Sequence, residues 1–364
     1  MDVRDNRAAA ALGSRYAFNS VALTATTSGT AADIRPDARA HAATAAAPYS
    51  LVADYAELFK ARVSTMVLIT SAAGFYLGSL RSGISPFNLG AVKALIGITA
   101  VTCGSSALNQ VLERKTDRLM HRTQARPVAA GRISLAHGLL IGFLATFSGS
   151  LYLARACNPL TGTLTLLTCV GYVAIYTPLK QVSPINTFIG AFPGALPPLI
   201  GWTAARGMIE WPAVALFAIL FLWQFPHFMA IGWMYRGDYA RAGIRLTATQ
   251  PDQRYAARSS AVQAVFYAVL MIAAAVWPFA LGVAGRGYVI AAVLLSLGYL
   301  WFAVRFARAA FRATAQDDFS DLRDRDEAAP SALQSARHLL RASVIYLPLL
   351  LAAMMLDARG RLLF

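Results

Sequence analysis

Long apolar stretches, separated by short polar segments, recur along most of this 364-residue chain. About 18 consecutive apolar residues suffice for a helix to cross the hydrocarbon core of a bilayer. The pattern predicts nine such helices, and therefore an all-α, polytopic membrane protein built as a helical bundle. The predicted spans are residues 63–80, 89–108, 134–154, 160–177, 185–203, 212–234, 261–283, 288–306 and 339–356.

The composition agrees with a membrane protein, and only the net positive charge needs a separate explanation. Residues are 57% hydrophobic and 14% charged, whereas soluble domains carry about 25% charged residues. The net charge of +15 could indicate nucleic acid or anionic lipid. With the N-terminus inside, however, 26 of the 33 lysines and arginines fall on the inner side of the membrane. This bias is the positive-inside pattern, so the charge indicates topology, and we expect no nucleic-acid partner.

The N-terminal segment is rich in Ala, Thr and Ser, and no apolar core precedes a cleavage site. We therefore predict a disordered cytoplasmic tail over residues 1–54 and a single transmembrane domain over residues 55–364. An Arg- and Ala-rich start also resembles a mitochondrial presequence. The expected location is the bacterial cytoplasmic membrane, multi-pass with a cytoplasmic N-terminus, and the alternative is the mitochondrial inner membrane.

An amide and two carboxylates stand four residues apart at the end of the second span. On a helix, Asn109, Glu113 and Asp117 lie along one face. Arg122 and Arg126 follow directly. A line of oxygen ligands beside arginines can hold a hard cation together with a phosphorylated substrate. The alternative is an exposed helix end with surface ion pairs, which are common and contribute little to stability.

Four further residues carry candidate chemistry. Asp238 lies among arginines after the sixth span, as a second metal ligand or as part of a charge-balanced loop. Lys180 is the only cation between spans four and five, where it could neutralise a diphosphate or anchor the loop at the headgroups; Tyr176 could hydrogen-bond there. His227 lies inside an apolar segment, where a histidine is more often a hydrogen-bonded core residue than a ligand, although imidazole also ligates haem iron.

The fifth span is unusually rich in proline and glycine. Such a sequence predicts a broken helix, and broken backbone is tolerated at membrane depth only where it faces protein or a cavity. We expect this span beside the substrate cavity, with a simple packing kink as the alternative. The charged inner loops follow spans two and six, which suggests two related halves around a shared site. The residues concerned in span five are Gly190, Pro193, Gly194, Pro197, Pro198 and Gly201.

Four stretches of the chain resemble the UbiA superfamily of intramembrane prenyltransferases. The resemblance covers residues 55–357, and RTxxRP after the acid stripe, with PHF and DYxxAG after span six, is typical of its haem-farnesylating branch. The stretches are NQVLERKTDRLMHRTQARPVAAGRIS, YTPLKQVSPINTFIGAFPGALPPLIGW, FLWQFPHFMAIGWMYRGDYARAG and LLRASVIYLPLL.

The resemblance implies nine helices around a central cavity, with Mg²⁺ as the cofactor. It also implies roles for the candidate residues. These are metal ligation by Asn109, Glu113, Asp117 and Asp238, diphosphate binding by Asn109, Arg122, Arg126 and Lys180, catalysis by Glu113, Asp117, Tyr176 and Lys180, and haem contact by His227.

The implied reaction is farnesyl transfer from farnesyl diphosphate to a vinyl group of haem B, giving haem O for terminal oxidases. The expected partners are haem B, farnesyl diphosphate, membrane lipid, and a haem A synthase or oxidase assembly factors. The alternatives are a prenyltransferase for a quinone precursor such as 4-hydroxybenzoate, and a non-enzymatic haem or lipid transporter.

The chain departs from the family pattern at Glu113, often Asp in relatives, and at Arg245 and Leu246, where the haem branch commonly has Pro-Met. Quinone-type relatives also carry a second acid four residues after the Asp238 position, where this chain has Ala242.

Overall fold

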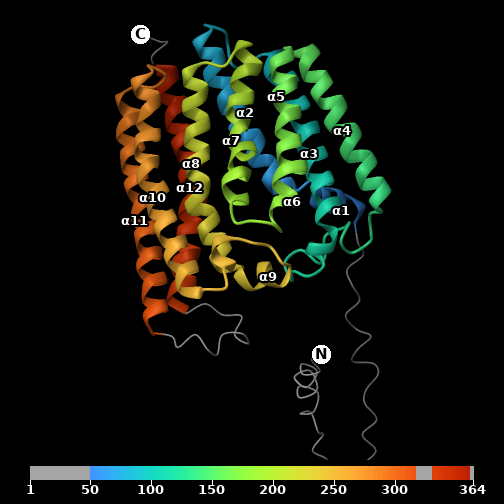
Figure 1. The fold of residues 1–364 in the computed structure, drawn as a ribbon. Helices are drawn as coiled ribbons and strands as arrows, with labels where there is room; N and C mark the ends of the chain where they lie inside the picture. Colours follow the sequence, from blue (N-terminus) through green and yellow to red (C-terminus); the bar gives the residue numbers. More distant parts are fainter. Residues whose placement is uncertain (1–49, 317–329, 361–364) are drawn as a thin grey trace, which may run out of the picture. The chain divides into compact units, whose positions relative to one another are not determined.

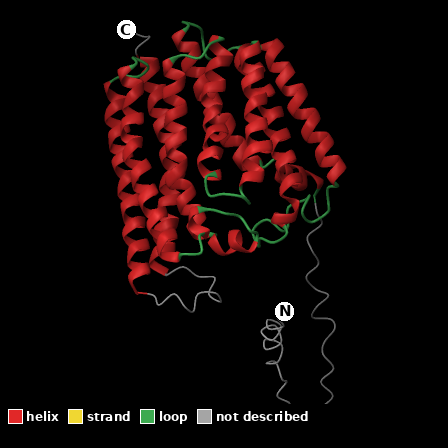
Figure 2. Ribbon diagram, in the orientation of Figure 1, coloured by secondary structure: helices red, strands yellow, loops and turns green. Residues whose placement is uncertain are grey.

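The computed structural model describes residues 50–316 and 330–360. Within these ranges, nine helices are long and apolar enough to cross a membrane, which confirms the predicted all-α polytopic fold (Figure 1). Helices account for all the regular secondary structure of the described residues (Figure 2). The spanning elements are α2 (Ala61–Arg81), α3 (Leu89–Asp117), α4 (Leu135–Ala156), the run Pro159–Leu179, α7 (Asn186–Arg206), α8 (Trp211–Met234), α10 (Gln253–Ala280), α11 (Arg286–Gln316) and α12 (Pro330–Gly360).

The helices pack chiefly against their neighbours around the bundle: α3 on α4, α2 on α7, α7 on α8, and α10 on α8 and α11. Their outer faces are apolar, as lipid contact requires. On α4, for example, the side chains of Leu140, Phe143 and Phe147 are all more than half exposed. Such a surface is stable only in a hydrocarbon environment.

Side-chain caps fix where several helices begin. The side-chain oxygens of Asn88, Ser134 and Asn158 each accept a hydrogen bond from the backbone N–H three residues later, at the starts of α3, α4 and α5 (Pro159–Val170). Asp252 accepts two such bonds at the start of α10. Because these residue types satisfy the first free N–H groups, they are favoured at helix starts.

The short elements gather at one end of the bundle (Figure 1). They are α1 (Leu51–Leu58), α9 (Arg236–Arg241) and the 3₁₀ turn η2 (Thr247–Thr249). The loops after α3 and α8 meet here. The backbone N–H of His121 lies 3.4 Å from Asp238 Oδ1, and Arg122 Nη2 donates to the Tyr239 hydroxyl over 3.2 Å. This contact agrees with the expectation that both loops serve one site.

The predicted N-terminal tail falls mostly on residues 1–49, which lie outside the described residues. Its last four residues, however, belong to α1. Asp54 is buried and receives two hydrogen bonds from Arg132 Nε, at 2.9 and 3.1 Å. A buried, paired carboxylate fixes this segment against the loop after α3, so the domain begins before residue 55.

The expected break in span five is wrong, because α7 is a continuous helix despite three internal prolines. Its glycines instead permit close helix contact. A Cβ on Gly201 would lie 1.8 Å from the Ser71 carbonyl oxygen, and one on Gly74 of α2 would lie 1.9 Å from that of Pro198. Neighbouring helices thus support α7 where its own hydrogen bonds are missing, as membrane helices allow. The first residues of α7, Asn186 and Thr187, line a cavity.

The irregular backbone lies in span four instead. After α5, residues Gly171–Tyr176 form a π-helix, η1, which continues into the short α6 (Thr177–Leu179). A π-helical turn inside a longer helix often marks a functional site, because it changes which side chains face inward. Here it sets the directions of Tyr172 and Tyr176.

Candidate active site

The acidic stripe, defined as Asn109, Glu113 and Asp117, lies on one face of α3 as the spacing predicts. Asn109 and Asp117 are fully buried. The Asn109 amide is held on both sides, since its Nδ2 donates to Thr177 Oγ1 over 2.9 Å and its Oδ1 accepts from Lys60 Nζ at 2.5 Å. The stripe is therefore part of the bundle interior rather than a solvated helix end.

Both carboxylates of the stripe are paired with predicted cations. Arg126 donates to both Asp117 oxygens, each over 2.9 Å, and lies 3.8 Å from Glu113. Lys180 Nζ donates to Glu113 Oε1 over 2.6 Å. The chain folds back after α3 to bring Arg126 into place, and the Thr123 hydroxyl donates to the Asp117 carbonyl oxygen at 3.0 Å. These bidentate and charge-assisted contacts are the geometry that the alternative of weak surface pairs lacks.

The surroundings shift the pKa values of Lys180 and Arg126. Burial lowers the pKa of Lys180, but Tyr176 and Glu113 raise it by more, so the net direction is upward. The Arg126 pKa is likewise raised, because Asp117 more than offsets the effect of burial. Both side chains therefore stay cationic at neutral pH.

Lys60 completes this group, and the sequence pattern did not single it out. It precedes α2 in a left-handed backbone conformation, at φ 48°, which is uncommon for a residue other than glycine. Its ammonium contacts Asn109 and lies 3.3 Å from the Tyr172 hydroxyl. Burial lowers its pKa to about 7, against the attraction of Glu113. The available signal was its position, since it is a basic residue one position before the first spanning helix.

A cavity of about 200 Å³, here called the charged cavity, opens between these residues. Both carboxylates, four basic side chains and one face of α8 line it. Four basic groups against two acids leave an excess of positive charge, which suits a polyanionic ligand. The lining includes Lys60, Glu113, Asp117, Arg122, Arg126, Tyr176 and Lys180, with Asn186 and Thr187 of α7, Phe228, Met229, Ile231 and Gly232 of α8, and Tyr239 after it.

Ring contacts hold two further lining residues of the cavity, Tyr176 and Arg122. The Tyr176 ring lies 4.4 Å from Lys180 Nζ, a cation–π contact. Gly190 of α7 makes room for this ring, because a Cβ there would lie 2.4 Å from it. The Arg122 guanidinium lies over the rings of Tyr235 and Tyr239, at 5.1 and 5.8 Å from their centroids.

Three predicted residues are not among those that line the cavity. Asn109 instead bonds to Lys60 and Thr177. Asp238 is paired with Arg241 in the same short helix and is not among the lining residues, whereas its neighbour Tyr239 is. His227 does not line the charged cavity; its Nδ1 lies 2.7 Å from Ser343 Oγ of α12, and its ring stacks on Trp223. His227 is therefore packed between helices in this structure, and its contact with haem stays a prediction.

The unusual Arg245 has a structural role. Its backbone N–H donates to the Lys180 carbonyl oxygen over 2.7 Å, and its own carbonyl oxygen accepts from Asn186 Nδ2 at 2.6 Å. A proline at this position could not donate the first bond. The loop after α9 thus supports the segment that carries Lys180, by a hydrogen bond that the common Pro-Met sequence lacks.

The fold and the charged cavity define a polytopic membrane protein of the prenyltransferase type, and the comparisons give the family. The profile of the UbiA prenyltransferase family matches residues 67–322, so the chain belongs to that family. Among curated relatives, "Protoheme IX farnesyltransferase" of Koribacter versatilis is 44% identical over 308 residues, covering 85% of this chain and 94% of the relative. The protein of the same name from Solibacter usitatus is 37% identical, covering 84% and 99%.

Solved structures share the fold at low identity. A digeranylgeranylglyceryl phosphate synthase matches with a TM-score of 0.62 and 16% identity, over 84% of this chain and 98% of its own. A UbiA homologue from Archaeoglobus fulgidus, bound to GPP and Mg²⁺, matches with a TM-score of 0.53 and 18% identity, over 83% and 99%. Both likenesses confirm the helical architecture.

Proposed function

We propose that this protein transfers a farnesyl group from farnesyl diphosphate to a vinyl group of haem B, giving haem O. The observation that carries the proposal is the charged cavity, where two buried carboxylates and four basic side chains meet inside an apolar bundle. The names of the curated relatives support the haem acceptor. A transport path usually has its polar groups near the midplane, whereas these gather at one end of the bundle.

The donor set fits a magnesium ion. Mg²⁺ takes one or two carboxylates and completes its shell with water and phosphate oxygens. Glu113 and Asp117 both line the cavity and would hold it. Asn109 and Asp238 remain secondary ligands in this proposal, because neither is among the residues that line the cavity. When bound, the ion stabilises negative charge on the diphosphate.

The basic side chains would assist departure of the diphosphate. As the C1–O bond breaks, the electron pair goes to the diphosphate oxygen. Arg122, Arg126 and Lys180 would bind the anion, and Lys60 would become fully protonated beside it. Glu113 and Asp117 would exchange their present partners, Lys180 and Arg126, for the metal ion. Each of these groups is held in place before the reaction by the pairs described above.

The allylic cation left behind needs a site with little water. The α8 face of the cavity is apolar and provides it, and the ring of Tyr176 offers its electron-rich face nearby. The terminal carbon of the haem vinyl group would attack C1 of the farnesyl cation. The new cation, next to the pyrrole ring, would take a water molecule and release a proton, giving the hydroxyethylfarnesyl side chain.

The charge bias and the bacterial relatives support a place in the bacterial cytoplasmic membrane, with the N-terminus and the loops after α3 and α8 on the cytoplasmic side. The mitochondrial inner membrane is the less favoured alternative. A haem A synthase and oxidase assembly factors remain predicted partners.

Synthesis of haem O by the purified protein tests the proposed function. The purified protein in liposomes, supplied with haem B, farnesyl diphosphate and Mg²⁺, should give a product with the mass of haem O. A parallel reaction with 4-hydroxybenzoate as acceptor should give none. A folded preparation that binds haem but forms no haem O would contradict the proposal. Prenylated 4-hydroxybenzoate would assign the quinone-type activity instead, and haem flux without product would indicate a transporter.

A further inference from the structure

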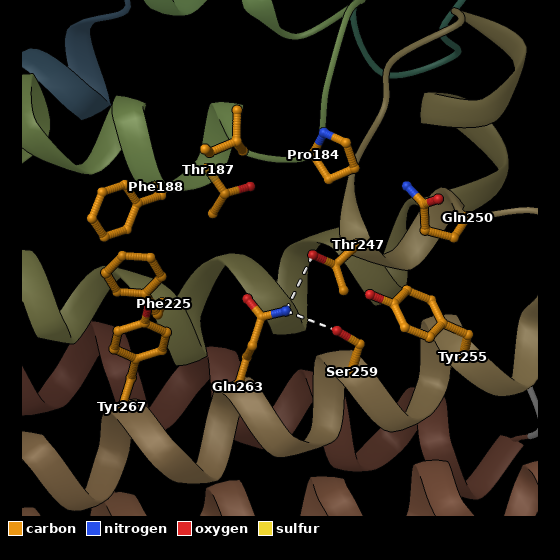
Figure 3. Close-up of a pocket in the computed structure, with 11 residues that line it drawn as sticks. Pro184, Thr187, Phe188, Phe225, Thr247, Gln250, Tyr255, Ser259, Gln263 and Tyr267 are labelled. Atoms are coloured by element: carbon orange, nitrogen blue, oxygen red, sulfur yellow. Dashed lines mark hydrogen bonds between the residues drawn. The ribbon is translucent and has the colours of Figure 1, made fainter.

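A second pocket, here called the side pocket, opens beside the charged cavity and has a volume of about 290 Å³ (Figure 3). It lies between the start of α7, the η2 turn and α10. Thr187 and Thr247 line both spaces, and both are buried. A molecule in the side pocket would therefore lie against the wall of the site where we place the diphosphate.

One face of α10 builds the longest wall of the side pocket. Tyr255, Ser259, Gln263 and Tyr267 follow one another at intervals of four residues and all line it. Residues at that spacing lie on one side of a helix. The Gln263 amide donates to Ser259 Oγ over 3.0 Å and to Thr247 Oγ1 over 3.4 Å (Figure 3). Gln263 thus connects the α10 face to the shared wall.

Aromatic rings from α7, α8 and α10 form one end of the side pocket (Figure 3). The rings of Phe225 and Tyr267 stack with their centroids 3.7 Å apart and an interplanar angle of 10°. Phe188 lies next to them, with its centroid 6.2 Å from that of Phe225, and 41% of its surface is exposed. Such a surface binds flat conjugated molecules by stacking and edge contacts.

The chemistry of the lining differs from that of the charged cavity. None of the described residues that line the side pocket is charged, but hydroxyl and amide groups are frequent. A flat ring system can stack on the aromatic rings of the side pocket, while the polar groups of its wall bond to one another, as Gln263 does to Ser259 and Thr247. The charged cavity already offers the prenyl chain an apolar face on α8.

We propose that the side pocket receives the vinyl-bearing edge of the acceptor porphyrin, and that Gln263 and Tyr267 determine acceptor binding. This rests on the proposed haem farnesylation. The volume is near the lower end for a small-molecule site, so part of the macrocycle would stay outside. The exposed side chains of Ile185 and Tyr255 form the mouth. In haem B the propionates lie away from the vinyl groups, so they would remain outside this uncharged pocket.

Two substitutions test the pocket. Ser259→Phe places a ring in it, and Gln263→Leu removes the amide at nearly constant size. We expect kcat/KM for haem to fall by about tenfold or more with Ser259→Phe, because the pocket is blocked. It should fall about fivefold with Gln263→Leu, because the hydrogen bonds that hold Ser259 and Thr247 in the wall are lost. Mg²⁺-dependent binding of the unreactive analogue farnesyl thiodiphosphate should stay at the wild-type value.

Val262→Phe is the matched control, because this neighbouring side chain on α10 is 58% exposed and does not line the pocket. It should leave both substrates unaffected. If the wild type makes haem O while both pocket variants keep the wild-type KM for haem, the side pocket is not the acceptor site, and the proposed function stands. A rise in KM for farnesyl diphosphate instead would assign the pocket to the prenyl chain. Absence of haem O from the wild type would reject the function itself.

Discussion

The two inner loops of this protein differ in how their acidic residues are held. In the first, at the end of α3, Glu113 is paired with Lys180 from another segment and Asp117 with Arg126 of the same loop, and both carboxylates line the charged cavity. In the second, Asp238 pairs with Arg241, three residues along the same short helix, lies 3.4 Å from the His121 backbone N–H, and does not line the cavity. The pair of Glu113 and Lys180 spans 67 positions of sequence and is fixed by the tertiary structure, whereas a pair three residues apart needs only one turn of helix. We infer that the first loop carries the chemistry and the second encloses it.

Glu113→Gln should show the largest effect. The substitution keeps the size but removes the charge, and leaves Lys180 without its anion. Loss of one preorganised electrostatic partner costs about 10²–10³ in kcat. The measurement is the rate of haem O formation in liposomes. Glu210→Gln, in an ion pair with Arg206 near the start of α8, is the control and should retain the wild-type rate. Equal losses in both variants would show that damage to the fold is responsible.

Lys180→Met should have the next largest effect. It removes a buried cation that contacts Glu113 and faces the proposed diphosphate. We expect kcat/KM for farnesyl diphosphate to fall by about 10- to 100-fold, as for a lost charged hydrogen bond. Lys115→Met makes the same change at an exposed lysine beside the stripe and should behave as the wild type. A Lys180 variant with unchanged kcat/KM would remove this residue from the site.

Lys60→Met should weaken the binding of farnesyl diphosphate by about tenfold, since one charge-assisted contact to the ligand is lost. The effect is smaller because Lys60 is the member of the group whose pKa is lowered, and because its ammonium mainly orients Asn109. Titration with farnesyl thiodiphosphate in the presence of Mg²⁺ measures it. Lys93→Met, in the first turns of α3, is the control. Undiminished affinity would leave Lys60 with a structural role only.

His227→Phe should change catalysis least, by less than about twofold, because ring stacking on Trp223 is kept and no cavity contact is lost. The lost contact with Ser343 should instead lower the thermal stability of the protein by a few degrees, as one hydrogen bond does. Haem O formation and a melting curve on the same preparation separate the two. A fall in haem affinity, with stability unchanged, would restore the haem-contact role that the sequence suggested.

The sequence predicts well what depends on local spacing. Nine apolar runs correspond to nine helices, and Asn109, Glu113 and Asp117 share a face because an α-helix repeats every 3.6 residues. Arg126 and Lys180 lie beside the acidic stripe, as their positions in the charged inner loops predict. The missed features depend on packing. Lys60 reaches Asn109 across 49 positions of sequence, and the π-helix that directs Tyr172 has no simple sequence pattern.

The wrong expectation of a break in span five has the same origin. Proline lowers helix stability in water, but α7 packs against α2, α5 and α8, and such packing lets membrane helices tolerate proline. The partners of Asp238 and His227 are equally invisible in the sequence, since Arg241 is one of several nearby arginines and Ser343 lies 116 residues away. Residue type and spacing therefore indicate which groups can act, and tertiary contacts decide which of them meet.

The most direct test compares Asp117→Asn with Asp238→Asn in one experiment, by the initial rate of haem O formation across a titration of Mg²⁺. The account predicts that Asp238→Asn keeps the Mg²⁺ dependence and most of the rate, while Asp117→Asn loses about 10²–10³ of the rate at every Mg²⁺ concentration. The reverse result, in which Asp238→Asn loses activity and Asp117→Asn retains it, would contradict the assignment of the chemistry to the first loop.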